Sequence, residues 1–109
     1  MVASAASQLE ESELTRAAEL FRALSSPIRL LVVLELTAGP RCVHELSEAM
    51  RPSGREVSQP LLSQHLRVLR EVGLVSTTRR ATEVTYQLVE DHTGRIVRDA
   101  IRHARQNLP

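Results

Sequence analysis

One change of residue pattern constrains the fold of this chain more than any other feature. Between Ser58 and Gly73, leucines repeat at helical spacing, Ser58 is a residue type that caps helix starts, and Gly73 suits a helix end. Residues 74–80 and 83–89 then become rich in β-branched side chains, with a short turn between them. The sequence therefore predicts a capped helix that leads directly into a two-stranded hairpin.

Four further helices follow from apolar periodicity and from breaker residues. They are predicted over residues 8–24, 27–37, 43–50 and 92–107, and a loop is predicted over residues 51–56. Ser26 and Pro27 mark the start of the second helix, as a cap and a first-turn proline. Residues 1–7 are Ala/Ser-rich and are expected to form a flexible arm, which leaves residues 8–109 as one domain.

The composition limits the size of the core and the class of the protein. The 109 residues include one Phe, one Tyr and no Trp, so the core must be aliphatic, and small domains of this kind often gain core by dimerising. A single cysteine excludes a disulfide within the chain. The sequence shows neither a membrane span nor a signal peptide, which predicts a cytoplasmic protein with no membrane partner.

Positive charge is concentrated in the middle of the chain. All 14 basic residues are arginines, and the net charge is only +1. Residues 51–80 nevertheless hold six Arg against two Glu, whereas residues 1–40 hold three Arg against five Glu. Since arginine suits contacts with phosphate and guanine, the basic middle segment favours a nucleic-acid partner.

The order of elements is helix, helix, helix, helix, strand, strand, helix, which is mostly α with a small β-hairpin. Within it, a short helix, a connection and a helix with a polar outer face precede a basic hairpin. This is the arrangement of a winged helix-turn-helix, in which the second helix enters the major groove and the hairpin reaches along the DNA backbone.

Candidate DNA contacts lie on the polar face of the helix that begins after Ser58. Amides, hydroxyls and guanidiniums near the start of such a helix can read base edges. The candidates are Ser58, Gln59, Ser63, Gln64, His65 and Arg67. For His65, a DNA contact and a packing role between helices are equally supported. Arg79 and Arg80, at the hairpin tip, are predicted phosphate contacts.

Four segments together resemble the ArsR/SmtB family of metal-responsive transcriptional regulators. They are LFRALSSPIRLLVVLEL, CVHEL, PLLSQHLRVLREVGLV and DHTGRIVRDAIRHA, within residues 13–106. The resemblance implies a homodimer joined through the first and last helices, and a repressor that a ligand, usually a metal ion, releases from its operator. The interface is then expected to include Leu14, Ala17, Phe21, Val97, Ala100, Ile101 and Ala104.

Two histidines of the last predicted helix suggest how a metal would be held. His92 and His103 are eleven residues apart, which is three turns plus about 20°, so they share a face but stand about 16 Å apart. One helix cannot bring both to one ion, whereas two antiparallel copies about a twofold axis can. Asp99 shares their stripe, as a partner that orients His103 or as a ligand itself.

The resemblance extends this set to Glu90, His92, His103 and Gln106. The family usually has Asp at the first of these positions, where Asp91 can substitute for Glu90, and His or Glu at the last, where Gln106 is a weaker ligand. Nitrogen and oxygen donors without thiolate favour zinc or nickel, with cobalt as a third option. Cys42 and His44 occupy a position that soft-metal sensors use, but one thiolate cannot form a three-sulfur site, so a structural role for Cys42 is favoured.

These observations favour a DNA-binding regulator, expected to be a repressor, whose affinity for double-stranded operator DNA responds to a divalent metal. A second hypothesis keeps DNA binding without metal sensing, so that the protein acts constitutively or with an accessory protein. A third, from another class, is a protein-interaction module. An enzyme is not expected, because no nucleophile–base pair, Gly-rich phosphate loop or paired carboxylates can be placed together.

Overall fold

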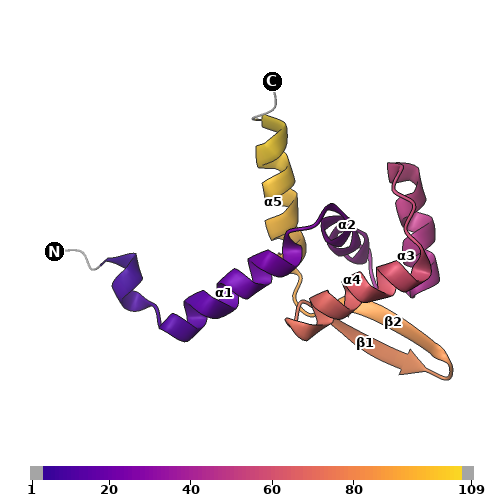
Figure 1. The fold of residues 1–109 in the computed structure, drawn as a ribbon, viewed down its shortest axis with the longest axis horizontal. Coiled ribbons are helices and arrows are strands. Elements are labelled where there is room, and N and C mark those ends of the chain that lie inside the picture. The colour runs from indigo at the N-terminus through magenta and orange to yellow at the C-terminus, as the bar shows by residue number, and fades with distance from the viewer. Residues whose placement is uncertain (1–3, 107–109) are drawn as a thin grey trace.

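The computed structural model describes residues 4–106. Five α-helices, two short 3-10 helices and two strands follow one another along the chain (Figure 1). Their bounds are η1 Ala5–Gln8, α1 Glu11–Leu24, α2 Pro27–Leu36, α3 Val43–Met50, η2 Arg51–Ser53, α4 Gln59–Glu71, β1 Val75–Arg80, β2 Glu83–Leu88 and α5 His92–Gln106. The predicted order of helices and strands is confirmed, and residue 107 of the predicted last helix lies outside the described part.

Helix α1 begins later than the sequence predicted. The start expected at residue 8 is wrong, because a capping box fixes it at Glu11. In this box the backbone N–H of Glu10 donates to Oε1 of Glu13 over 3.2 Å. Residues 5–8 form the separate 3-10 helix η1 instead, capped by Ser4.

Two predicted serine caps are present. The hydroxyl of Ser26 accepts from the backbone N–H of Arg29 at 3.4 Å, and that of Ser58 accepts from Leu61 at 3.3 Å. A proline follows each serine within the first turn of α2 and α4, where its missing N–H costs no helical hydrogen bond. The starts of both helices are therefore encoded locally.

The hairpin is antiparallel, with Val75 paired with Leu88 at its base and Arg80 paired with Glu83 at its tip. Ala81 in the turn has φ 55°, a left-handed conformation that is unusual for a residue with a Cβ. A further bridge between Arg41 and Tyr86 joins the segment before α3 to β2. This bridge holds the hairpin against the helical body.

The core is almost entirely aliphatic, as predicted. Leucines at one face of α4 pack with valines of α2 and with Leu46 and Met50 of α3, and all of these side chains are almost inaccessible to solvent. Val97 of α5 belongs to the same core, with only 1% of its surface exposed. Its predicted place in the dimer interface is therefore wrong, because it faces the body of its own chain.

A close approach between α2 and α5 depends on a glycine. Gly94 is buried, and a Cβ added to it would lie 2.5 Å from Cγ2 of Thr37, at the end of α2. The hydroxyl of Thr37 donates to the carbonyl of Leu34 at 2.6 Å and accepts from Nη2 of Arg98 at 2.9 Å. The methyl group of Thr37 is thus held toward the glycine by two hydrogen bonds.

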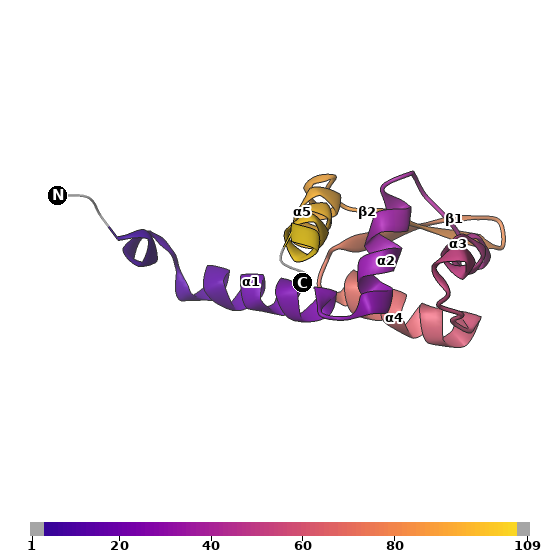
Figure 2. The same ribbon diagram turned by 90° about the horizontal axis from the view of Figure 1, so that it is seen from above.

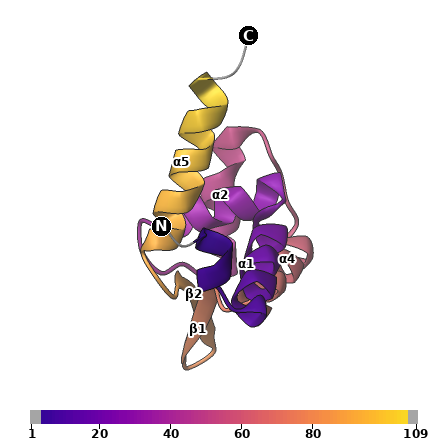
Figure 3. The same cartoon turned by 90° about the vertical axis from the view of Figure 1, so that its left-hand side faces the viewer.

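The elements are arranged so that α1 stands out from the rest of the chain (Figure 2). Helix α5 and the hairpin extend in opposite directions from the helical body (Figure 3). Among the described residues, no helix is long and apolar enough to cross a membrane.

Candidate nucleic-acid interface

The polar face of α4 is open to solvent. Leu62, Leu66 and Leu69 are fully buried on one side of the helix. The opposite side is exposed and carries Gln59, Ser63, Gln64, Arg67 and Arg70. The polar side chains, which suit contacts with base edges, are therefore available to a partner. The leucines pack the helix against the rest of the chain.

The start of α4 and the tip of the hairpin lie at the same end of the molecule. Helix α4 runs toward the α1 side, and β1 then runs back alongside it (Figure 1). Arg79 and Arg80 are exposed at the far end of β1. The polar start of α4 and the two arginines therefore form one end of the molecule, opposite the start of α1.

His65 lies between helices. It is half-buried, and its Nδ1 is 3.5 Å from Nη1 of Arg29 on α2. Burial, followed by the charge of Arg29, lowers the pKa of His65 below its usual value, so the neutral ring is favoured. Of the two roles predicted for His65, these contacts support packing between α2 and α4.

His44 contacts the polar face of α4, which the sequence did not predict. Its Nδ1 lies 3.4 Å from Nε2 of Gln59, and both side chains are exposed. The contact joins the first turns of α3 and α4, the two helices of the helix-turn-helix. No local sequence pattern predicts this contact, because the two residues are fifteen positions apart.

Cys42 immediately precedes α3. Its backbone N–H donates to Oε1 of Glu45 at 2.9 Å, and this hydrogen bond is the main reason that the pKa of Glu45 is lowered. The thiol is half-buried. These features agree with the structural role that the sequence favoured for Cys42.

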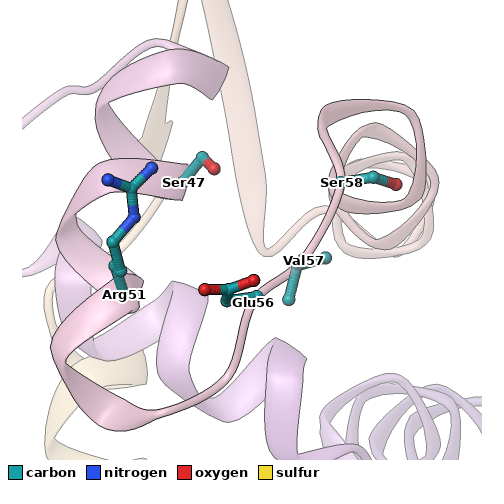
Figure 4. A pocket seen from close by; sticks show the side chains of 5 residues that line it. All are labelled: Ser47, Arg51, Glu56, Val57 and Ser58. Carbon is teal, nitrogen blue, oxygen red and sulfur yellow. The ribbon is translucent and has the colours of Figure 1, made fainter.

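A cleft of about 490 Å³ opens between the end of α3 and the start of α4. Figure 4 shows Ser47 and Arg51 on one wall, Glu56 below them and Ser58 on the opposite side. Arg51 is paired with Glu48 across 3.0 Å, and both side chains are largely exposed. The cleft exists because residues 51–58 connect the two helices with a longer segment than the usual turn of about three or four residues.

The predicted metal ligands stay apart within one chain. Glu90, Asp91, His92, Asp99, His103 and Gln106 are all exposed. Within residues 4–106, no three His, Cys, Asp or Glu side chains gather closely enough to hold an ion. The two histidines lie toward opposite ends of α5, so a site that uses both would need a second copy of the chain, and this arrangement stays a prediction.

An apolar face remains open on the side of α1 and α5. Phe21 is 64% exposed, Leu14 46% and Ile96 44%. A hollow of about 90 Å³ lies between these helices, lined by Ala17, Leu20, Phe21, Leu24, Leu74, His92, Thr93 and Ile96.

Of the interface residues predicted on α5, Ala100 and Ala104 are exposed, and Ile101 is half-buried. Ile96 was not among the predicted interface residues. The spacing of apolar residues did not show which side of α5 is covered by the rest of the chain and which side stays open.

Comparison with known proteins identifies related regulators. Residues 26–77 match the model of the bacterial regulatory protein, arsR family. The HTH-type transcriptional repressor SmtB of Mycobacterium tuberculosis is 46% identical over 91 residues, which are 84% of this chain and 64% of that protein. The HTH-type transcriptional regulator NmtR of the same species is 34% identical over 96 residues, 88% of this chain and 76% of that protein.

A solved structure supports the fold. The homodimeric winged helix-turn-helix DNA-binding domain of a possible ArsR-family regulator from Mycobacterium bovis has a TM-score of 0.76 at 22% identity, covering 100% of this chain and 94% of that one. The predicted winged helix-turn-helix is confirmed. The names of these relatives are those of regulators, in agreement with the prediction that the chain is not an enzyme.

Proposed function

Since the chain belongs to the ArsR family of bacterial regulatory proteins, we propose that it is a homodimeric transcriptional repressor whose operator affinity responds to a divalent metal. The observation that carries the DNA-binding part is the polar start of α4 beside the basic hairpin tip, at one end of the molecule. A helix of this kind fits the major groove, and basic hairpin residues fit the adjoining phosphates.

In this proposal, the residues that contact base edges are Gln59, Ser63, Gln64 and Arg67. Gln64 and Arg67 offer the bidentate groups that suit adenine and guanine edges. Ser58 contributes mainly as the cap that orients the first turn of α4, because its hydroxyl already accepts from Leu61. His65 contributes by fixing α4 against α2.

Dimerisation is supported by the open apolar face. Isolated apolar side chains are common on surfaces, but Phe21 and Ile96 border one hollow on two neighbouring helices, and Leu14 is exposed two turns before Phe21 on α1. A twofold axis on this side would cover the face and bring the two α5 helices together. The start of one α5 can then approach the end of the other.

The metal part of the proposal rests on residues of both ends of α5. His92 of one protomer and its partner's His103 would supply nitrogen donors, with Glu90 and Gln106 as oxygen donors. Such a donor set suits zinc or nickel. A bound ion would link the two protomers and so favour one dimer geometry over another.

The test is fluorescence anisotropy with the DNA upstream of the protein's own gene. The protein is titrated without metal, with zinc and with nickel. We expect metal to lower the operator affinity at least tenfold, and His92→Ala and His103→Ala each to abolish that change. Asp99→Ala is measured beside them: loss of the metal response would support a role for Asp99 as a ligand or as the partner that orients His103, and an unchanged response would exclude both roles.

The other possible outcomes lead to different conclusions. Tight DNA binding that ignores both metals would favour a regulator that acts constitutively or with an accessory protein. Absence of DNA binding would favour a protein-interaction module. An increase of affinity with metal would retain the sensor and reverse the sign of its response.

The two arginines of the hairpin tip give a separate prediction. Arg79→Ala combined with Arg80→Ala should weaken binding to operator and unrelated DNA alike, because phosphate contacts carry no sequence information. In the proposed dimer each protomer loses two contacts, so the slope of log affinity against log salt should fall by about 4. Anisotropy titrations at several salt concentrations measure this slope, and an unchanged slope would count against phosphate contacts at the tip.

A further inference from the structure

A cavity of about 340 Å³ lies where the end of α2, the end of β2 and the start of α5 meet. Helix α2 contacts both of the other elements, and residues 89–91 alone separate β2 from α5. The volume is within the range of pockets that hold small organic molecules, about 300–1,000 Å³. The described residues that line it lie outside the polar face of α4 and outside the hairpin tip. The cavity is therefore separate from the candidate nucleic-acid interface.

A glycine forms part of the cavity wall. Gly39 follows α2 and has φ 132°, a conformation in which a residue with a Cβ is strained. The chain turns there into Pro40, and Arg41 then pairs with Tyr86 of β2. A Cβ added to Gly39 would meet no atom within 4 Å. The segment after α2 thus bounds the cavity without filling it.

Two arginines of α5 line the cavity. Arg95 and Arg98 are three residues apart, so they lie on the same side of the helix. Nη2 of Arg98 donates to the hydroxyl of Thr37 over 2.9 Å, which restricts the orientation of this guanidinium. In the described part of the chain, neither arginine forms an ion pair with a carboxylate. A bound anion would neutralise both charges, and the planar guanidinium suits a carboxylate.

An amide and an acid line the same cavity. Oε1 of Gln87 accepts from the hydroxyl of Thr78 at 3.3 Å, which leaves the amide nitrogen to donate. Asp91 precedes Arg95 by one helical turn, yet no ion pair joins them among residues 4–106. An ionised carboxylate only accepts hydrogen bonds. The cavity therefore places one acceptor beside three donors.

The remaining surface of the cavity is partly apolar. Leu36 is 3% exposed and Leu88 is half-buried, and both line the cavity. Small-molecule sites commonly combine such apolar walls with a few polar groups that fix the orientation of the ligand. A fitting ligand has a carboxylate, a hydrogen-bond donor close to it and a hydrocarbon part.

We propose that this cavity binds a small 2-amino or 2-hydroxy carboxylic acid. Arg95, Arg98 and the amide nitrogen of Gln87 donate to its carboxylate. Asp91 accepts from the amino or hydroxyl group on the neighbouring carbon, and the hydrocarbon part packs against Leu36. This site goes beyond the proposed function, and it depends on neither the proposed dimer nor the proposed metal.

Isothermal titration calorimetry of the full-length protein tests the site, without metal and in a buffer free of carboxylates. The probes are the standard L-amino acids, with lactate and malate as 2-hydroxy acids. We expect at least one probe to bind with a Kd of about 1 mM or tighter. Its analogue without the carboxylate, an amine or an alcohol, should bind at least about tenfold more weakly, because the arginines then lose their partner.

Three variants locate the ligand. Arg95→Gln should weaken binding at least about tenfold, and it removes no ion pair that the described residues form. Arg105→Gln is the matched control, because it removes the same charge from the same side of α5 outside the cavity. It should leave the Kd within about twofold of the original. Asp91→Asn should weaken a 2-amino acid more than a 2-hydroxy acid, because only the ammonium loses an opposite charge.

The results that would overturn the site are distinct from those that support it. Failure of every probe to bind at about 10 mM would overturn it. Binding that Arg95→Gln leaves unchanged, or that Arg105→Gln weakens as much, would do the same, since the general charge of α5 would then explain the attraction. Loss in Arg95→Gln with retention in Arg105→Gln would support it. Operator binding is measured separately, so failure here leaves the proposed function untouched.

Discussion

Replacing Gln64 and Arg67 together with alanine should abolish the preference of the protein for its operator. A good bidentate contact to a base edge contributes about 1–3 kcal/mol of discrimination. The proposed dimer makes each of the two contacts twice, so losing all four should reduce operator affinity at least about 100-fold. Binding to unrelated DNA should change much less. Both side chains are exposed, so the substitutions should leave the fold unchanged.

Competition anisotropy with operator and scrambled duplexes measures this preference. Arg70→Ala is the matched control, because Arg70 is an exposed arginine of the same helix that borders a small cavity with Arg16 and Glu19 near α1. An equal loss on both duplexes would identify Arg67 as a phosphate contact. Full retention of operator preference would refute the assignment of α4 as the reading helix.

Gly94→Ala should destabilise the protein although alanine is the better helix former. The added Cβ would stand 2.5 Å from Cγ2 of Thr37. Thr37 cannot rotate away without losing its hydrogen bonds to Leu34 and Arg98. Overpacking of this kind costs about 1–3 kcal/mol, and the helix preference for alanine returns less than about 1 kcal/mol. We expect a net loss of about 1 kcal/mol in the free energy of unfolding.

Urea denaturation at a fixed protein concentration measures the loss, and Thr37→Ser provides the control. Serine keeps the hydroxyl and removes only the methyl group that the new Cβ would meet. In the double variant, Gly94→Ala should therefore cost little or even stabilise α5. A cost that persists in the Thr37→Ser background would show that the close contact is not its cause.

Local signals in the sequence predicted the fold well. The caps at Ser26 and Ser58 and the prolines after them fix two helix starts, because their hydrogen bonds lie within one turn. The start of α1 was misplaced because its cap uses Glu10 and Glu13, and Glu10 is not among the residue types usual at that position.

Contacts between elements were harder to predict. The role of His65 depends on Arg29, 36 residues away, and the sequence alone could not choose between packing and DNA contact. Val97 and Ile96 are neighbours, yet the first is buried in its own chain and the second is 44% exposed. One residue rotates a helix face by about 100°, and only the position of α2 decides which side of α5 it covers.

The projecting α1 links folding to protein concentration. Isolated helices of fewer than about 12–15 residues are marginal in water, and α1 has 14 residues with little of its own chain to pack against. In the proposed dimer, the partner provides the missing surface, so ordering of α1 and association become one coupled equilibrium. The midpoint of thermal unfolding should then rise with protein concentration by mass action. In a cell with few copies, the abundance of the regulator would itself determine how much of it is assembled and able to bind both halves of an operator.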